Sequence, residues 1–132
     1  MIFVDSSFWI GIADKFDTCH AAAIALAKTH DGAELATTNH VVGETWTFLR
    51  KRHGHRAATQ FLDRSEQTER LEIAFVTAEL EREAWSWLRR HDERGYSFVD
   101  ATSFALMRHL RIGEAFAFDG DFAAAGFVEL RA

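Results

Sequence analysis

Short apolar runs alternate along the whole chain with longer segments of helical pattern. In segment 78–93, for example, Leu80, Ala84 and Leu88 recur at the spacing of one helix face. The apolar runs predict strands at residues 2–4, 34–38, 71–76, 115–118 and 127–130. The segments between them predict two helices before residue 31, separated near residues 17–18, and further helices at 40–53, 55–66, 78–93 and 98–111.

Strands separated by helices are typical of βαβ units. They predict an α/β fold with a central, mostly parallel sheet of about five strands and helices on both faces. The 132 residues contain no low-complexity tract and no linker, which predicts one domain over residues 1–132. Ligands of such sheets bind beyond the carboxyl ends of the strands, so a functional site is expected there.

Composition narrows the possible functions and locations. The net charge of −5 argues against a surface that grips nucleic acid everywhere, although it leaves room for a local basic patch. The single cysteine, Cys19, and the lack of an apolar run of roughly 18 residues predict a cytoplasmic protein without a membrane segment. The basic residues cluster at Arg50, Lys51, Arg52, His53, His55 and Arg56, with a smaller pair at Arg89 and Arg90. Such a cluster fits a solvated helix end as well as an RNA contact.

Two aspartates follow predicted strands. Asp5 comes after the first strand and Asp119 after the fourth, so both belong to the carboxyl edge of the predicted sheet. Each also has a purely structural interpretation. Asp5 fits the N-cap of the next helix, and Asp119-Gly120-Asp121 fits a turn.

Two further acids stand near the starts of predicted helices. Glu44 shares a helix face with Val41 and Phe48, an unfavourable place for a carboxylate unless it has a partner or reaches water at the margin of that face. Asp100 follows Ser97 by three residues, a spacing that resembles a capping box, although the motif prefers Glu or Gln at the later position. A capping aspartate can still direct its second oxygen elsewhere.

Taken together, the four acids suggest a metal site. Strand ends and the helix starts that follow them meet at one edge of a doubly wound sheet. Carboxylates gathered there would repel one another and raise each other's pKa. Mg²⁺ or Mn²⁺ would relieve this repulsion, since both prefer oxygen ligands, and such an ion suits hydrolysis of phosphodiester bonds. The acids concerned are Asp5, Glu44, Asp100 and Asp119.

At these residues the sequence resembles the PIN-domain ribonucleases, and among them the VapC-type toxins of toxin–antitoxin pairs. The matching segments are FVDSS (3–7), GETW (43–46), SFVDATSFALM (97–107) and FAFDGDF (116–122), in the expected order. The third segment is the most specific. The resemblance spans essentially the whole chain and implies a PIN-like three-layer sandwich with Mg²⁺- or Mn²⁺-dependent endoribonuclease activity.

The resemblance also assigns roles to individual residues. It implies that the catalytic and metal-binding acids are Asp5, Glu44, Asp100 and Asp119, that Asp121 is a further acid of more variable role, and that Ser7 helps to orient the cluster. The chain departs from the family at Ala117, where a threonine is common. The lost hydroxyl would loosen the hydrogen bonding around Asp119 or a metal-bound water, while the acids themselves are kept.

The partners follow from the same resemblance. It implies an RNA substrate, a homodimer and a VapB-type antitoxin that carries a basic side chain to the acidic site. The aromatic helices of the N-terminal half would suit an amphipathic partner helix.

Two other functions are compatible with acids at strand ends. Aspartyl-phosphate enzymes use a lysine late in the chain, whereas the last lysine here is Lys51, which argues against them. A non-catalytic PIN-like module that binds RNA or protein is the stronger alternative. Such modules are expected to have lost some of the acids that this chain keeps.

Overall fold

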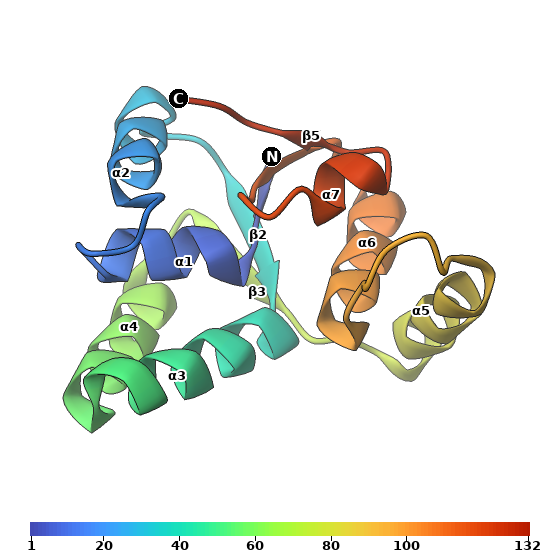
Figure 1. The fold of residues 1–132 in the computed structure, drawn as a ribbon, viewed down its shortest axis with the longest axis horizontal. Coiled ribbons are helices and arrows are strands. Elements are labelled where there is room, and N and C mark those ends of the chain that lie inside the picture. Colours follow the sequence, from blue (N-terminus) through green and yellow to red (C-terminus); the bar gives the residue numbers. More distant parts are fainter.

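All four neighbouring pairs of strands run parallel, in the order β3-β2-β1-β4-β5. The computed structural model describes residues 1–132 without a gap. The strands are β1 (Ile2–Val4), β2 (Leu35–Thr38), β3 (Leu71–Ala74), β4 (Glu114–Phe116) and β5 (Val128–Glu129). The helices are α1 (Ser6–Ala13), α2 (His20–Thr29), α3 (Asn39–His53), α4 (His55–Gln67), α5 (Ala78–Arg90), α6 (Phe98–Leu110) and α7 (Asp121–Ala124). The predicted α/β three-layer sandwich is confirmed (Figure 1).

The alternation of side chains along β1 divides the core between the two helical layers. Ile2 and Val4 pack in one buried cluster with Phe8 of α1 and Leu26 of α2. Phe3 points to the opposite face and joins the larger cluster, which is built mainly from α5 and α6. Figure 1 shows α1–α4 on one side of the sheet and α5–α7 on the other. None of the helices has the length and apolar character that crossing a membrane requires.

The connections at the carboxyl edge are short and capped. Asp5 alone separates β1 from α1 and serves as the helix N-cap. The last residue of β2, Thr38, caps α3 by accepting the N–H of Val41. Ser97 caps α6. These caps place the first turns of α1, α3 and α6 at the edge where the sequence predicts a site.

Two strands, β3 and β4, end two residues earlier than predicted, because side chains from other elements bond to the backbone groups that would extend them. The N–H of Val76 donates to Asn39 Oδ1 at 2.8 Å, and β3 ends at Ala74. The N–H of Phe118 donates to Ser7 Oγ at 3.1 Å, and β4 ends at Phe116. Residue 119 therefore lies in the loop beyond the strand and does not end it.

The sequence does not predict α7, because Asp119-Gly120-Asp121 fits a turn. The turn exists, with Gly120 in the left-handed region at φ 84°, a conformation that favours glycine. It leads directly into α7, which begins at Asp121. The remaining predicted boundaries agree with the structure to within one helical turn.

Candidate active site

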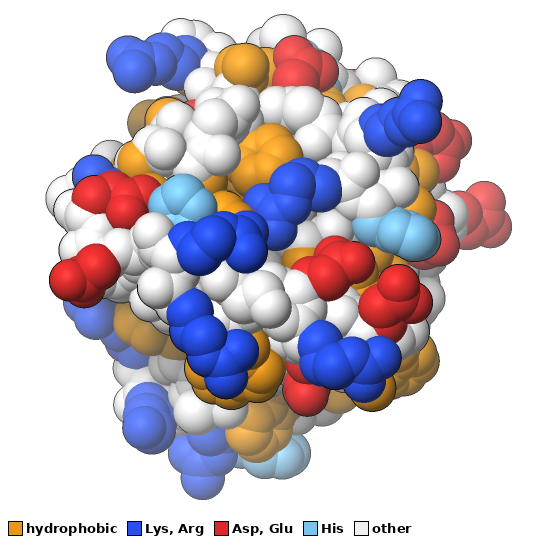
Figure 2. Space-filling view, turned by 90° about the vertical axis from the view of Figure 1, so that its right-hand side faces the viewer, with side chains coloured by type: hydrophobic (Ala, Val, Ile, Leu, Met, Phe, Trp, Pro, Cys, Tyr) orange, Lys and Arg blue, Asp and Glu red, His pale blue; other side chains and the backbone are white.

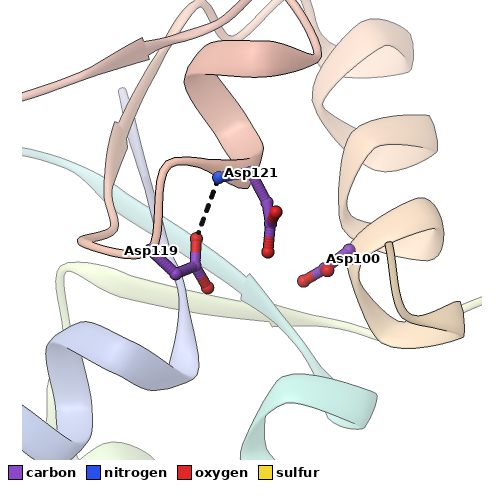
Figure 3. A group of neighbouring side chains, drawn as sticks. All are labelled: Asp100, Asp119 and Asp121. Carbon is purple, nitrogen blue, oxygen red and sulfur yellow. Dashed lines mark hydrogen bonds between the residues drawn. The ribbon is translucent and has the colours of Figure 1, made fainter. Parts of the chain in front are cut away.

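Three aspartates converge at the carboxyl edge of the sheet (Figure 3). Asp100 comes from the first turn of α6, Asp119 from the loop after β4, and Asp121 from the start of α7. Each offers one carboxylate oxygen, and these oxygens lie within 4.8 Å of one another. Their side chains point toward a common space in Figure 3. The structure thus brings together three of the five acids that the resemblance assigns to the site.

Asp100 both caps its helix and faces the cluster. Its Oδ2 accepts the N–H of Ser97 at 3.0 Å, and Ser97 Oγ accepts the N–H of Asp100 at 2.9 Å, which completes a capping box. Burial is the main cause that raises the pKa of Asp100 to about 6; the charges of Asp119 and Asp121 raise it further, while the bonds to Ser97 oppose the shift. The predicted capping box is confirmed.

Asp5 lies deeper than the three clustered aspartates. It is 1 % exposed, and its Oδ2 accepts the backbone N–H of Ser7 at 3.2 Å and the Ser7 hydroxyl at 2.8 Å. Burial, followed by the charge of Asp119, raises the pKa of Asp5 to about 7, against the hydrogen bonds from Ser7. Asp100 adds a smaller repulsion. Asp5 is therefore coupled electrostatically to the cluster, although its oxygens are not among the three within 4.8 Å.

Ser7 connects Asp5 to the loop that carries Asp119. Its hydroxyl donates to Asp5 and accepts the N–H of Phe118, the residue just before Asp119. Ala117, where the family commonly has threonine, is 1 % exposed and packs in the main core. The loop at this point is thus held by Ser7 from the neighbouring element, which supports the expectation that Ser7 orients the site.

Glu44 lies at the margin of the site. Its side chain is exposed on α3, as expected if it reaches water, and its Oε1 accepts the hydroxyl of Ser6 at 2.7 Å. Ser6 is the residue next to Asp5, so Glu44 is connected to the site through α1. The structure does not bring Glu44 into the group of three clustered carboxylates. The contact with Ser6 was not foreseen from the sequence.

Arg94 is the site-forming residue that sequence reasoning missed. Its Nε–H donates to Asp121 Oδ1 at 2.9 Å, and its Nη2 donates to the carbonyl oxygen of Asp119 at 3.3 Å. The N–H of Asp121 also donates to Asp119 Oδ1 at 3.2 Å, the dashed line in Figure 3. Arg94 stands in the α5–α6 connection, and no sequence motif links it to the Asp-Gly-Asp segment.

The basic cluster at residues 50–56 lies away from this site. Arg52 and His53 end α3, whereas Glu44 lies in the first half of that helix. Arg52 Nε and His53 Nε2 lie 3.8 Å and 3.2 Å from Asp14 Oδ2, at the end of α1. Part of the cluster therefore joins α3 to α1.

The donor set fits a hard divalent cation. The converging ligands are all carboxylate oxygens, which Mg²⁺ and Mn²⁺ prefer, and the group contains no thiolate or imidazole. The raised pKa values of Asp5, Asp100 and Asp119 reflect burial and mutual repulsion that a bound cation would offset. Asp100 and Asp119 would be the principal ligands of such an ion; Asp121 converges on the same space, but its Oδ1 already accepts a hydrogen bond from Arg94.

The PIN domain family model matches residues 2–128. The chain is a PIN-domain protein. It is 53 % identical over 131 residues to "23S rRNA-specific endonuclease VapC20" of Mycobacterium tuberculosis, in both strain CDC 1551 and strain H37Rv. These alignments cover 99 % of this chain and 98 % of each relative.

A solved structure also matches this chain over its whole length. The crystal structure of Mycobacterium tuberculosis VapC20, described as a sarcin–ricin loop cleaving toxin, has a TM-score of 0.94 and 51 % identity to this PIN-domain protein. Each chain is covered completely. The predicted resemblance to VapC-type PIN domains is confirmed.

Proposed function

We propose that this PIN-domain protein is a Mg²⁺- or Mn²⁺-dependent endoribonuclease and the toxin of a VapBC-type toxin–antitoxin system. The observation that carries the proposal is the convergence of Asp100, Asp119 and Asp121, with the buried Asp5 behind them. A group of carboxylates with raised pKa values is unfavourable when ionised unless an opposite charge, such as a bound cation, offsets the repulsion. Such groups cluster at functional sites. The VapC-type relatives make RNA cleavage the reaction that this site fits best.

The proposed substrate is 23S ribosomal RNA, at the sarcin–ricin loop. Support comes from the 53 % identity to a 23S rRNA-specific endonuclease and from the structural match to a sarcin–ricin loop cleaving toxin. A loop suits such an enzyme, because its unstacked nucleotides expose the phosphodiester backbone. Ribosomes as the target place the activity in the cytoplasm.

The proposed reaction is hydrolysis by in-line attack. Water attacks the phosphorus, the bond from phosphorus to the 3′-oxygen breaks, and the leaving oxygen takes up a proton. The products carry a 5′-phosphate and a 3′-hydroxyl. A bound Mg²⁺ would stabilise charge on the phosphate and lower the pKa of the attacking water.

The chain's own residues have separate proposed roles in metal binding, in positioning the water and in orienting Asp5. Asp100 and Asp119 would hold the cation, and Asp5 would supply negative charge behind them. Glu44, exposed and fixed by Ser6, positions the attacking water and accepts its proton. Ser7 sets the orientation of Asp5.

The face formed by α5–α7 has basic side chains that could follow an RNA backbone. Figure 2 shows basic side chains on this side of the molecule, with carboxylates between them; α5–α7 themselves contribute arginines and no lysine. Three arginines, Arg82, Arg90 and Arg108, line one groove between α5 and α6. Contacts of this kind give affinity that falls as salt rises.

The proposed protein partners are a VapB-type antitoxin and a second copy of the chain. A basic antitoxin side chain would pair with the carboxylates that otherwise hold the cation. A cavity of about 160 Å³ between α1 and α4, lined in part by Trp9, Ile12 and Phe61, suits one apolar side chain of an amphipathic partner helix.

Mapping cleavage on intact ribosomes tests this proposal. Purified protein with Mg²⁺ or Mn²⁺ is expected to produce one strong primer-extension stop, in the sarcin–ricin loop. Cleavage elsewhere would refute the substrate, and intact RNA under all conditions would favour a binding module. Asp63→Asn, an exposed aspartate of α4, is the control and should cleave like the wild type.

A further inference from the structure

Arg94 is the only basic side chain that forms a hydrogen bond or ion pair with the acidic cluster. It makes two contacts with the Asp-Gly-Asp turn: Nε with the carboxylate of Asp121, and Nη2 with the backbone carbonyl of Asp119. The turn fits closely against it, since a Cβ built on Gly120 would lie 3.4 Å from Arg94 Nη2. The guanidinium therefore contacts both aspartates of this loop, Asp121 through its carboxylate and Asp119 through its backbone.

The contact leaves Asp121 less able to bind a metal than its two neighbours. Arg94 occupies Oδ1 of Asp121 with a charged hydrogen bond of 2.9 Å. A positive charge in this position repels any cation that approaches the same carboxylate. Asp100 has no arginine partner, and Asp119 accepts the N–H of Asp121, a neutral donor.

We infer that Arg94 acts as a built-in cation for Asp121, so that the site binds one divalent ion, chiefly through Asp100 and Asp119. This inference rests on the proposed metal-dependent function. Arg94 is thus a positioning residue: it tethers Asp121 and the turn while limiting the positive charge that the cluster can accept. One guanidinium and one divalent cation together offset most of the charge of the acids gathered here.

Stability alone does not account for this arrangement. The side chain of Arg94 is 42 % exposed, and exposed ion pairs contribute little to folding. A matched comparison lies just before the starts of β2 and β3. Arg70 contacts the Asp31 carboxylate at 3.6 Å and the carbonyl of Ala33 at 3.3 Å, one acid and one carbonyl as for Arg94, but without an acidic cluster.

Calorimetric titration of the metal-free protein with Mn²⁺ tests the inference. The wild type is expected to bind one ion per chain. Arg94→Gln removes the competing charge and is expected to bind Mn²⁺ about three- to tenfold more tightly. Arg94→Lys keeps the charge and should stay near the wild type. Arg70→Gln, which loses the same charge elsewhere, should also stay near it.

Turnover of Arg94→Gln should decrease, although its affinity for Mn²⁺ increases. At saturating Mn²⁺, Arg94→Gln is expected to cleave RNA about tenfold or more slowly, because the loop carrying Asp119 and Asp121 loses its tether. Tighter metal binding with slower turnover is a combination that general destabilisation would not produce. Unchanged or weaker Mn²⁺ binding by Arg94→Gln, or two ions in the wild type, would overturn the inference.

The two proposals can fail separately. If the wild type cleaves RNA with added metal but Arg94→Gln binds Mn²⁺ like the wild type, only the role of Arg94 is refuted. If the wild type neither binds Mn²⁺ nor cleaves RNA, the proposed function itself is refuted.

Discussion

Ser7 holds Asp5 with two hydrogen bonds, one from its hydroxyl at 2.8 Å and one from its backbone N–H at 3.2 Å. Both favour the ionised carboxylate and act against burial, which raises its pKa to about 7. The same hydroxyl accepts the N–H of Phe118, so one side chain couples the charge of Asp5 to the position of the Asp119 loop.

Replacing Ser7 should therefore shift the pH dependence of cleavage. In Ser7→Ala the side-chain hydrogen bond is lost, and the pKa of Asp5 should rise above about 7. We expect the rising limb of the pH–rate profile to move to higher pH, and cleavage near neutral pH to fall about tenfold or more. Ser7→Thr, which keeps a hydroxyl, should restore much of the loss. An unshifted profile in Ser7→Ala would contradict this coupling.

Asp5 should make the metal-free protein less stable as pH rises. Its pKa is 3.8 as the ordinary value and about 7 in the folded chain, so the folded state binds more protons between these values. The free energy of unfolding therefore decreases as pH increases through this window. Asp5→Asn removes the buried charge and keeps an N-cap acceptor. It should raise the free energy of unfolding by on the order of 2–4 kcal/mol at about pH 8, and much less at about pH 4.

Chemical denaturation of Asp5→Asn and the wild type at both pH values measures this difference. The same variant should lose cleavage. Equal stability gains at both pH values would show that the charge of Asp5 is not the cause.

The parts of the site that could be predicted depend on local rules. Asp5 and Asp100 were found because caps and strand ends stand next to each other in the sequence, and the capping box at Ser97 is a three-residue pattern. Arg94 was not predictable, because its contact with Asp121 joins residues 27 apart through an irregular connection.

The same distinction explains the strand boundaries. The apolar patterns of residues 71–76 and 115–118 indicated strands in the right places. The predicted strands extend two residues too far. The N–H groups of Val76 and Phe118 donate to Asn39 and Ser7, which belong to elements distant in the sequence. Parallel pairing and the βαβ order, in contrast, follow from the alternation of elements alone.

Asp14 is predicted to stabilise the fold without taking part in cleavage. It is buried at the end of α1, and hydrogen bonds from the backbone N–H of Phe16 and from His53, together with nearby Arg52, lower its pKa. Its contribution is present above pH 3.8 and is lost as pH falls through the lower folded value. Asp14→Asn should lower Tm by roughly 3–5 °C at neutral pH.

Thermal melts followed by circular dichroism test this expectation. Asp31→Asn is the control, since Asp31 is exposed and pairs only with Arg70, and its Tm should hardly change. A Tm of Asp14→Asn equal to that of the control would show that the contacts of Asp14 add no stability.

Glu44 should affect turnover more than metal binding. It is exposed, contacts Ser6, and lies outside the group of three carboxylates. Glu44→Gln is therefore expected to lower kcat by roughly 10²–10³-fold, the scale of general-base catalysis, while Mn²⁺ affinity changes far less than in Asp119→Asn. Parallel titrations and single-turnover cleavage assays separate the two effects. Equal losses of affinity in both variants would make Glu44 a metal ligand.

Metal-dependent cleavage is tested directly with a sarcin–ricin loop RNA and metal-free protein, before and after Mn²⁺ is added, for the wild type and Asp100→Asn. We expect no cleavage without metal, full activity of the wild type on adding Mn²⁺, and at least a roughly thousandfold loss in Asp100→Asn with the metal present. Cleavage that persists in EDTA, or an Asp100→Asn variant as active as the wild type, would contradict this expectation.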